Sequence, residues 1–335
     1  MSVHARELAG DARWLPHRLI DGGRGLRFVR ADRDAQRAAT FLDDASLGEG
    51  ATRVDATMGD VVAAPVPGPA PMHFIFHSAF ARSTLLARAM DLPGVAMGLK
   101  EPIVLNDAAQ LHGQRRLARE VLALTLGLLG RPLAEGEAVI VKPSNIVNGL
   151  MPTLMALRPD ARALLLYRDL PGYLRSIARK GMFGRVWARQ MALHFRTDAP
   201  FDAGFSEADR FVHTDLQAAA LGWLIQHAQF AALARALPDR VRLLDAAALA
   251  TAPREAFAAT LRWFGLALDE AAVDDVVKGP AFSEDSKRIG ERFGGEGSGQ
   301  DAPVDEAEVR MVTEWIQAIA RHVGATLDFG PKLLG

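Results

Sequence analysis

The chain has 335 residues, of which 49% are hydrophobic, and its 39 basic side chains nearly balance its 40 acidic ones. A chain of this length can bury a large core, and its balanced charge excludes a global positive field that would draw it to nucleic acid or to an anionic membrane. The absence of cysteine excludes disulfides, thiolate metal sites and a cysteine nucleophile.

The sequence carries no sign of a membrane or secretory segment. Its first twenty residues mix charged and apolar side chains without an apolar run of signal-peptide length, and no apolar segment elsewhere is long enough to span a bilayer. We therefore expect a cytoplasmic protein with no membrane span. The histidines lack metal-ligand spacing, so we expect no metal.

Three parts of the chain differ in pattern. Residues 1–63 form an N-terminal appendage of unknown role, with a strand expected at 26–30 and a helical pattern at 35–47. Residues 64–71, APVPGPAP, are rich in proline and predict a stiff connector. Residues 72–335 then form an α/β domain.

In this third part, short runs of Val, Ile and Leu alternate with helix-length segments. The expected strands are 73–78, 95–100, 138–144, 161–169 and 241–247. The expected helices are 83–91, 107–129, 144–157, 171–180 and 214–237. The helix starts are indicated by the cap candidates Asn106, Ser144 and Thr214 and by Pro171 in a first turn.

This alternation predicts a parallel sheet with helices on both faces. In such a sheet the ligand lies at the carboxyl ends of the strands. Candidate functional residues are therefore sought directly after each strand.

The first expected strand is followed by a turn, HSAFARST (residues 77–84), of the kind that binds phosphate. Ser83 and Thr84 open the next helix, where unpaired backbone N–H groups and hydroxyls suit an anion. No lysine follows a glycine here, so the Walker pattern is absent and an ordinary ATPase or GTPase is disfavoured.

A second phosphate element follows the fourth expected strand. Arg168 stands at the end of that strand, and Ser176 lies eight residues later on the helix that Pro171 begins. A guanidinium fork with a hydroxyl donor is suited to a second phosphate. The alternative is an ordinary salt bridge between Arg168 and Asp169.

Together these two elements resemble the phosphate-binding elements of the bacterial sulfotransferase family. Residues 98–107 (GLKEPIVLND), 139–169 and 241–266 are similar to further family segments in the family's order, so the resemblance covers roughly residues 72 to 290. It implies a three-layer P-loop NTPase-like fold. It also implies transfer of a sulfuryl group from 3′-phosphoadenosine 5′-phosphosulfate to a hydroxyl or amine of a small-molecule or glycan acceptor, without a metal.

The resemblance also implies roles for single residues. The residues expected to bind the 5′-phosphosulfate end are Phe80, Ala81, Arg82, Ser83 and Thr84. Arg168 and Ser176 are expected to bind the 3′-phosphate, and Lys287 lies where the family often has a basic residue that reaches the cofactor.

Three residues are expected at the reacting group. Glu101 is the candidate base, because related sulfotransferases use a glutamate from this part of the fold. Lys100 is a candidate for contact with the sulfuryl oxygens, and Lys142 is the next candidate for contact with the transferred group. His77 is an alternative base, although a histidine in this strand is more often a packed, hydrogen-bonded residue.

The loop departs from the family pattern in two places. Phe80 stands where the family has a basic residue, and Arg82 stands where it has glycine, so Arg82 is the candidate for the loop's charge.

Two other functions stay open: a P-loop nucleotide kinase-like transferase that uses ATP, and a catalytically silent relative that serves as a binding module. Residues 181–213 and the first seventy residues are expected to shape the acceptor pocket, and neither the acceptor nor the oligomeric state can be read from the sequence.

Overall fold

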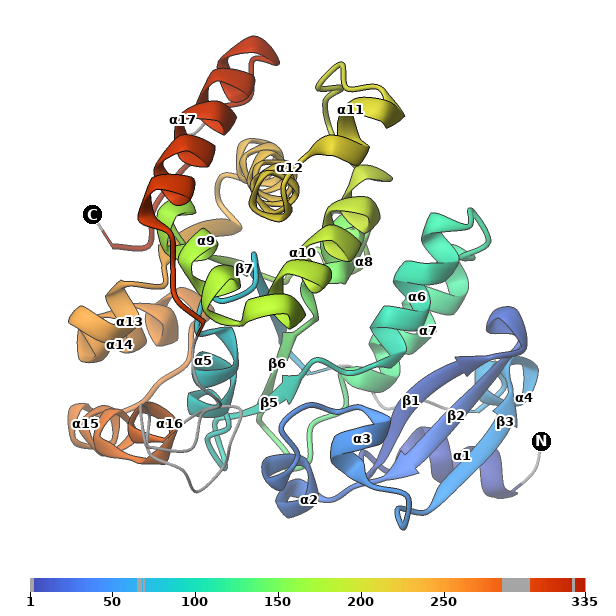
Figure 1. Ribbon diagram of the computed structural model, residues 1–335. Helices are drawn as coiled ribbons and strands as arrows, with labels where there is room; N and C mark the ends of the chain where they lie inside the picture. The colour runs from blue at the N-terminus through green and yellow to red at the C-terminus, as the bar shows by residue number, and fades with distance from the viewer. Residues whose placement is uncertain (1–2, 65–67, 69, 285–301, 327–328, 335) are drawn as a thin grey trace.

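The structure is a computed structural model that describes residues 3–64, 68, 70–284, 302–326 and 329–334 (Figure 1). Half of the proline-rich connector, residues 65–67 and 69, lies outside the described residues. No helix in the described ranges combines the length and the apolar character that crossing a membrane requires.

The N-terminal part of the chain forms a small antiparallel sheet of order β1-β2-β3. Its strands are β1 (Trp14–Ile20), β2 (Gly25–Arg30) and β3 (Arg53–Thr57). Its short helices are α1 (Val3–Gly10), η1 (Asp21–Gly23), α2 (Arg33–Ala38), α3 (Asp44–Leu47) and α4 (Met58–Val62). The strand expected at 26–30 is confirmed, whereas β1 and β3 were missed.

The single helical pattern expected at 35–47 is wrong, because the chain leaves the helix between α2 and α3. Leu42 is fully buried there. Its N–H donates to the carbonyl of Lys100 over 2.8 Å, and its carbonyl accepts from the N–H of Ile103 over 3.1 Å. These tertiary hydrogen bonds and the burial of Leu42 favour an extended turn over a continuous helix.

The main body is built on a parallel sheet of five strands in the order β5-β6-β4-β7-β8. The strands are β4 (Met72–His77), β5 (Ala96–Lys100), β6 (Ala138–Lys142), β7 (Ala163–Tyr167) and β8 (Val241–Asp245). All five expected strands are confirmed. Because β4 lies between β6 and β7, the turn that follows β4 stands at the centre of the sheet's carboxyl edge.

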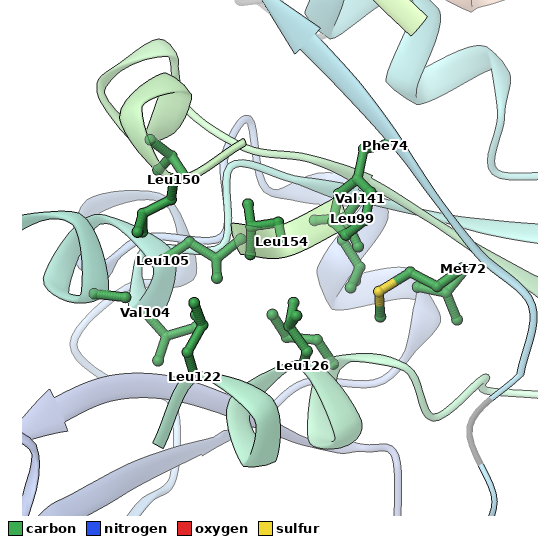
Figure 2. Close-up of a cluster of buried hydrophobic side chains, with 14 of the residues drawn as sticks. Met72, Phe74, Leu99, Val104, Leu105, Leu122, Leu126, Val141, Leu150 and Leu154 are labelled. Atoms are coloured by element: carbon green, nitrogen blue, oxygen red, sulfur yellow. The ribbon is translucent and has the colours of Figure 1, made fainter. Parts of the chain in front are cut away.

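Side chains that alternate along the strands face two separate cores. Phe74, Leu99 and Val141 belong to a cluster that also includes residues of α6 (Val104–Gly113), α7 (Arg119–Leu129), η2 (Asn145–Leu150) and α8 (Met151–Leu157); Figure 2 shows this packing. This cluster continues into the N-terminal sheet through Leu26 and Phe28.

The opposite face of the sheet carries a second apolar cluster. It contains Ile75, Ile140 and Leu164 together with buried residues of four helices. These helices are α5 (Ser83–Ala89), α13 (Ala248–Thr251), α14 (Pro253–Phe264) and α15 (Glu270–Lys278). The predicted fold class, a three-layer α/β fold with helices on both faces of a central parallel sheet, is confirmed.

A third cluster joins helices beyond the carboxyl edge. Its members come mainly from α9 (Leu170–Arg179), α10 (Gly181–Arg196), α12 (Asp215–Ala236) and α17 (Glu306–His322). The remaining described helices are α11 (Glu207–Val212) and α16 (Pro280–Ser283). In Figure 1, α9, α10, α12 and α17 stand together on one side of the sheet.

Local signals located some of the helix starts. Thr214 forms a capping box with Gln217 at the start of α12, and Pro171 lies in the first turn of α9, as expected. Asn106 is not a cap, because α6 already begins at Val104. Ser144 precedes a 3-10 turn without capping it through its side chain.

The helix expected over 107–129 is divided into α6 and α7. The division falls on exposed polar residues, and Arg115 there has φ 55°. Residues 114–116 have no apolar side chain to bury, so a continued helix would gain little from packing. The local polar sequence therefore overrides the average helical character of the segment.

Two arginines, the buried Arg131 and the half-buried Arg18, attach the N-terminal sheet to the main body. Arg131, which is 3% exposed, donates to the carbonyls of Leu8, Asp11 and Trp14 over 2.6 to 3.0 Å. Arg18 donates through two nitrogens to Asp107, each over 2.8 Å. Because these donors are charged, each contact contributes more than a hydrogen bond between neutral groups.

Two buried histidines predict loss of stability in mild acid. Burial lowers the pKa of His227 to about 3 and that of His73 to about 4. His227 Nδ1 donates to the carbonyl of Trp223 over 2.7 Å, while Nε2 is buried without a hydrogen-bond partner in the described structure. A second proton on this ring would therefore have no acceptor.

The direction in which stability changes with pH follows from these lowered pKa values. Below the ordinary histidine pKa of about 6.5 the unfolded chain binds more protons, so the free energy of unfolding falls as pH drops from about 6.5 towards 4, by about 1.4 kcal/mol per pH unit per histidine. Urea titrations of the wild type and of His227→Phe at pH 7 and pH 5 measure this. The variant is expected to show the smaller difference between the two pH values, and an equal difference would contradict the assignment.

Candidate functional site

A cavity of about 280 Å³ lies where β4, β5 and β6 end. One wall is the loop 79–84, and another is formed by Glu101 and Lys142 at the ends of β5 and β6. The start of α10 and Phe41 of the N-terminal part complete the lining. The expected position of the site, at the carboxyl edge of a parallel sheet, therefore holds a cavity with charged walls.

The loop after β4 has an unusual backbone. Ala79, Phe80 and Arg82 have φ values of 67°, 50° and 55°, in the left-handed region that residues other than glycine rarely adopt. Each such residue costs on the order of 1–3 kcal/mol and persists where the surroundings hold it. Backbone turns of this kind direct successive N–H groups into an anion-binding concavity.

Phe80 anchors this loop by packing. Its ring meets the rings of Tyr173 and Trp187 edge to face, with centroids 5.9 and 5.3 Å apart. Its carbonyl accepts a hydrogen bond from Arg168 Nη1 over 3.2 Å. The position that carries a basic residue in the family pattern is thus occupied by an aromatic anchor.

Arg82 brings positive charge to the same loop. It lines the cavity, and its charge contributes to lowering the pKa of Arg168, although burial is the larger cause of that shift. The loop therefore has a cation on its cavity side and another at its back.

Glu101 and Lys142 form an ion pair at the base of the cavity. Lys142 Nζ contacts Glu101 Oε1 and lies 3.4 Å from Thr84 Oγ1. The Lys142 side chain is 0% exposed and that of Glu101 is 20% exposed. Among the hydrogen bonds of the described residues, none uses Glu101 Oε2, so this oxygen can accept a proton from a bound molecule.

His77 is a structural residue of the strand end. Its Nδ1 accepts from the N–H of Ala79 over 3.1 Å, and its Nε2 donates to the carbonyl of Pro143 over 3.1 Å. Both ring nitrogens are thus used by backbone groups, which assigns the neutral tautomer with the proton on Nε2. A base at this position would have to break one of these bonds.

Lys100 is not brought to the cavity. Its Nζ donates to the carbonyls of Arg37, over 3.0 Å, and of Ala39. Burial lowers its pKa to about 8. The strand ends at Lys100, and Glu101 leaves it with a left-handed backbone at φ 51°, so Lys100 serves the N-terminal contact while Glu101 lines the cavity.

Arg168 and Ser176 each lie against Gly172 in the first turn of α9, and neither lines the cavity. Ser176 Oγ donates to the carbonyl of Gly172 over 2.8 Å. A Cβ at Gly172 would lie 2.7 Å from Arg168 Nε and 2.5 Å from Asp169 Oδ1, so only glycine leaves room for the guanidinium. The Asp169 side chain caps α9 by accepting from the Gly172 N–H over 3.2 Å.

The site contains residues that the sequence patterns did not indicate. Lys180 and Trp187 line the cavity from the start of α10, and Phe41 lines it from the N-terminal part. Helical spacing of 180, 183, 184 and 187 could have marked one face of α10, but nothing in the sequence linked Phe41 to the strand ends. Lys287 lies outside the described residues.

Only part of the segment expected to shape an acceptor pocket reaches this cavity. Between 181 and 213, Phe183, Gly184 and Trp187 line it. The second half of α10 faces a different cavity of about 450 Å³, which is formed with α11 and α12. No cluster of His, Cys, Asp or Glu among the described residues has an arrangement that could hold a metal ion.

Comparison with known proteins gives likenesses in fold alone. No family model and no curated protein matches the sequence. Similar solved structures include the sulfotransferase domain of the curacin biosynthetic pathway, at 13% identity and TM-score 0.41 over 77% of this chain and 99% of that one.

Two more solved structures are similar at the same level. The sulfotransferase domain of the Synechococcus PCC 7002 olefin synthase has 14% identity and TM-score 0.41 over 74% of this chain and 95% of that one. Retinol dehydratase, solved with androsterone and the inactive cofactor PAP, has 13% identity and TM-score 0.39 over 77% and 82%. Values this low do not transfer an activity, so the function is argued from the residues.

Proposed function

We propose that the protein is a sulfotransferase that moves a sulfuryl group from 3′-phosphoadenosine 5′-phosphosulfate to a hydroxyl or amine. The observation that carries this proposal is the hydrogen bond between Arg168 and the carbonyl of Phe80. It joins the two elements that the sequence likens to phosphate sites, the loop 79–84 and the first turn of α9, into one continuous surface.

The charges of this surface suit a donor with phosphates at both ends of its nucleoside. Arg82, Lys142 and Lys180 line the cavity against a single carboxylate, Glu101. Arg168 and the Ser176 hydroxyl stand at the other side of the loop. Two separated groups of donors fit a ligand with two separated phosphates better than a linear triphosphate, which needs its cations in one row.

Each residue of the site then has its own role in sulfuryl transfer. The loop's N–H groups and the Ser83 and Thr84 hydroxyls hold the 5′-phosphate, where charge grows as the bond to sulfur breaks. Lys142, which lies beside Thr84, neutralises the sulfuryl oxygens. Glu101 receives the acceptor's proton at Oε2, while its Oε1 stays with Lys142.

When bound, the donor supplies an activated sulfuryl group, and the protein supplies position and charge rather than a covalent intermediate. Arg168 fixes the far end of the donor through the 3′-phosphate. The Ser176 hydroxyl, now bonded to the Gly172 carbonyl, turns towards the same phosphate. Phe80 keeps the loop in its left-handed form through Tyr173 and Trp187.

A direct assay follows release of 3′,5′-phosphoadenosine from the donor by chromatography, with pooled phenols, alcohols and amines as acceptors. The wild type is expected to release product in an acceptor-dependent way. ATP in place of the donor is expected to yield no ADP. Release of ADP with the same acceptors, and no turnover of the sulfated donor, would contradict the proposal.

A further inference from the structure

The N-terminal segment 37–42 is bonded to the chain on both sides of Glu101. The Leu42 N–H donates to the carbonyl of Lys100 over 2.8 Å, and the Ile103 N–H donates to the carbonyl of Leu42 over 3.1 Å. The Lys100 ammonium adds bonds to the carbonyls of Arg37 and Ala39. A segment about sixty residues earlier in the sequence therefore holds the backbone that carries the proposed base.

Glu101 needs such support because its backbone is strained. Its φ is 51°, in the left-handed region, and a residue with a Cβ persists there only where its surroundings hold it. The Glu101 N–H donates to the carbonyl of Lys142 over 2.7 Å, which holds it from the β6 side. Leu42 holds it from the other side, so the carboxylate is directed into the cavity by two contacts.

Phe41, the neighbour of Leu42, contacts Lys142. The ammonium of Lys142 lies 5.3 Å from the centroid of the Phe41 ring, within the range of a cation–π interaction. The Lys142 side chain has no exposure, so little water weakens this attraction. Phe41 itself lines the cavity.

The segment is itself firmly placed. Arg33 pairs with Asp91 over 2.6 Å and with the fully buried Glu137, and Arg37 also pairs with Asp91. Leu42, next to Phe41, is 0% exposed. Phe41 therefore stands on a segment that is attached to the main body at several points.

We propose that Phe41 is a positioning residue of the reaction, which holds the Lys142 ammonium against Glu101, so that the N-terminal part completes the active site. The inference rests on the proposed function for its effect on turnover. Its effect on the accessibility of Lys142 does not depend on that function.

The test compares Phe41→Leu, Phe41→Tyr and Leu47→Ala in the full chain. Leu47 packs against the core from the same N-terminal part without lining the cavity, so its variant controls for a general loss of packing. Acetylation of Lys142 by acetic anhydride is measured by mass spectrometry relative to the exposed Lys332. Turnover of the sulfated donor and calorimetric binding of 3′,5′-phosphoadenosine are measured in parallel.

Phe41→Leu is expected to raise the relative acetylation of Lys142 about fivefold and to lower kcat about tenfold or more, with the dissociation constant of 3′,5′-phosphoadenosine unchanged. Phe41→Tyr, which keeps the ring, is expected to restore both values. The proposal is overturned if acetylation of Lys142 is unchanged in Phe41→Leu, or if Leu47→Ala reproduces both effects. Absence of binding and turnover in the wild type would refute the proposed function alone, because the acetylation result would still decide the role of Phe41.

Discussion

Glu101→Gln is expected to lower kcat about 10²–10⁴-fold, the range associated with loss of a general base. The amide keeps the size of the side chain but takes no proton at the position of Oε2. Binding of 3′,5′-phosphoadenosine is expected to change little, because the loop and Arg168 are untouched. Single-turnover measurement of product release, beside calorimetric titration of each protein, separates the two effects.

The same substitution also tests the ion pair, because it leaves the Lys142 ammonium without this carboxylate. Removing one partner of a buried pair costs about 3–5 kcal/mol, so part of the loss of activity could come from unfolding. Glu137→Gln is the matched control. Glu137 is fully buried and pairs with a cation, Arg33, but it does not line the cavity. Full turnover by Glu101→Gln would remove Glu101 from the role of base.

Arg168→Ala is expected to weaken binding of 3′,5′-phosphoadenosine about 10–100-fold and binding of AMP much less. A charged donor to a phosphate contributes about 1.5–3 kcal/mol, and AMP lacks the phosphate that Arg168 is proposed to hold. Calorimetric titration of both ligands against both proteins measures the difference.

The control for this second variant is Arg175→Ala. Arg175 lies on the same helix, α9, but it is directed to Glu306, which it contacts over 2.9 Å at the surface. It is expected to leave both affinities unchanged. An equal loss of affinity for the two ligands in Arg168→Ala would show that Arg168 acts only by holding the loop through the Phe80 carbonyl.

Sequence patterns predicted the strands of the sheet well because each strand is marked by its own residues and not by distant contacts. Each strand is a short, mainly apolar and largely buried run that is followed by a marked break, so strands could be placed without knowing their neighbours. The turn 77–84 was found for the same reason, since its serine and threonine directly follow the first strand of the sheet. The break between α6 and α7 was missed because its polar residues lie within an otherwise helical segment.

The candidate site was only partly predictable because its geometry comes from distant contacts. Lys100 and Glu101 are adjacent in sequence. The left-handed backbone of Glu101 and the carbonyls of segment 37–42 place Lys100 at the N-terminal part and Glu101 at the cavity. Phe41 has no local pattern that marks it. Its contact with Lys142 joins residues about one hundred positions apart.

The loop's departure from the family pattern has a physical explanation in the structure. Phe80 stands in place of the pattern's basic residue and packs against Tyr173 and Trp187. Arg82 stands in place of the pattern's glycine and has a left-handed backbone conformation. The sequence showed both departures but not that Arg82 lines the cavity while Arg168 bonds the Phe80 carbonyl of the same loop. That arrangement depends on how the turn bends, which nearest neighbours in sequence do not determine.

The proposed site for a donor with two separated phosphates is tested most directly by calorimetric titration of the wild type with 3′,5′-phosphoadenosine, AMP and ATP. We expect 3′,5′-phosphoadenosine to bind more tightly than AMP by about 10–100-fold, the contribution of charged donors to a second phosphate, and ATP to bind no better than AMP. Tight binding of ATP with no preference for the 3′-phosphate would contradict the account and favour a kinase-like transferase.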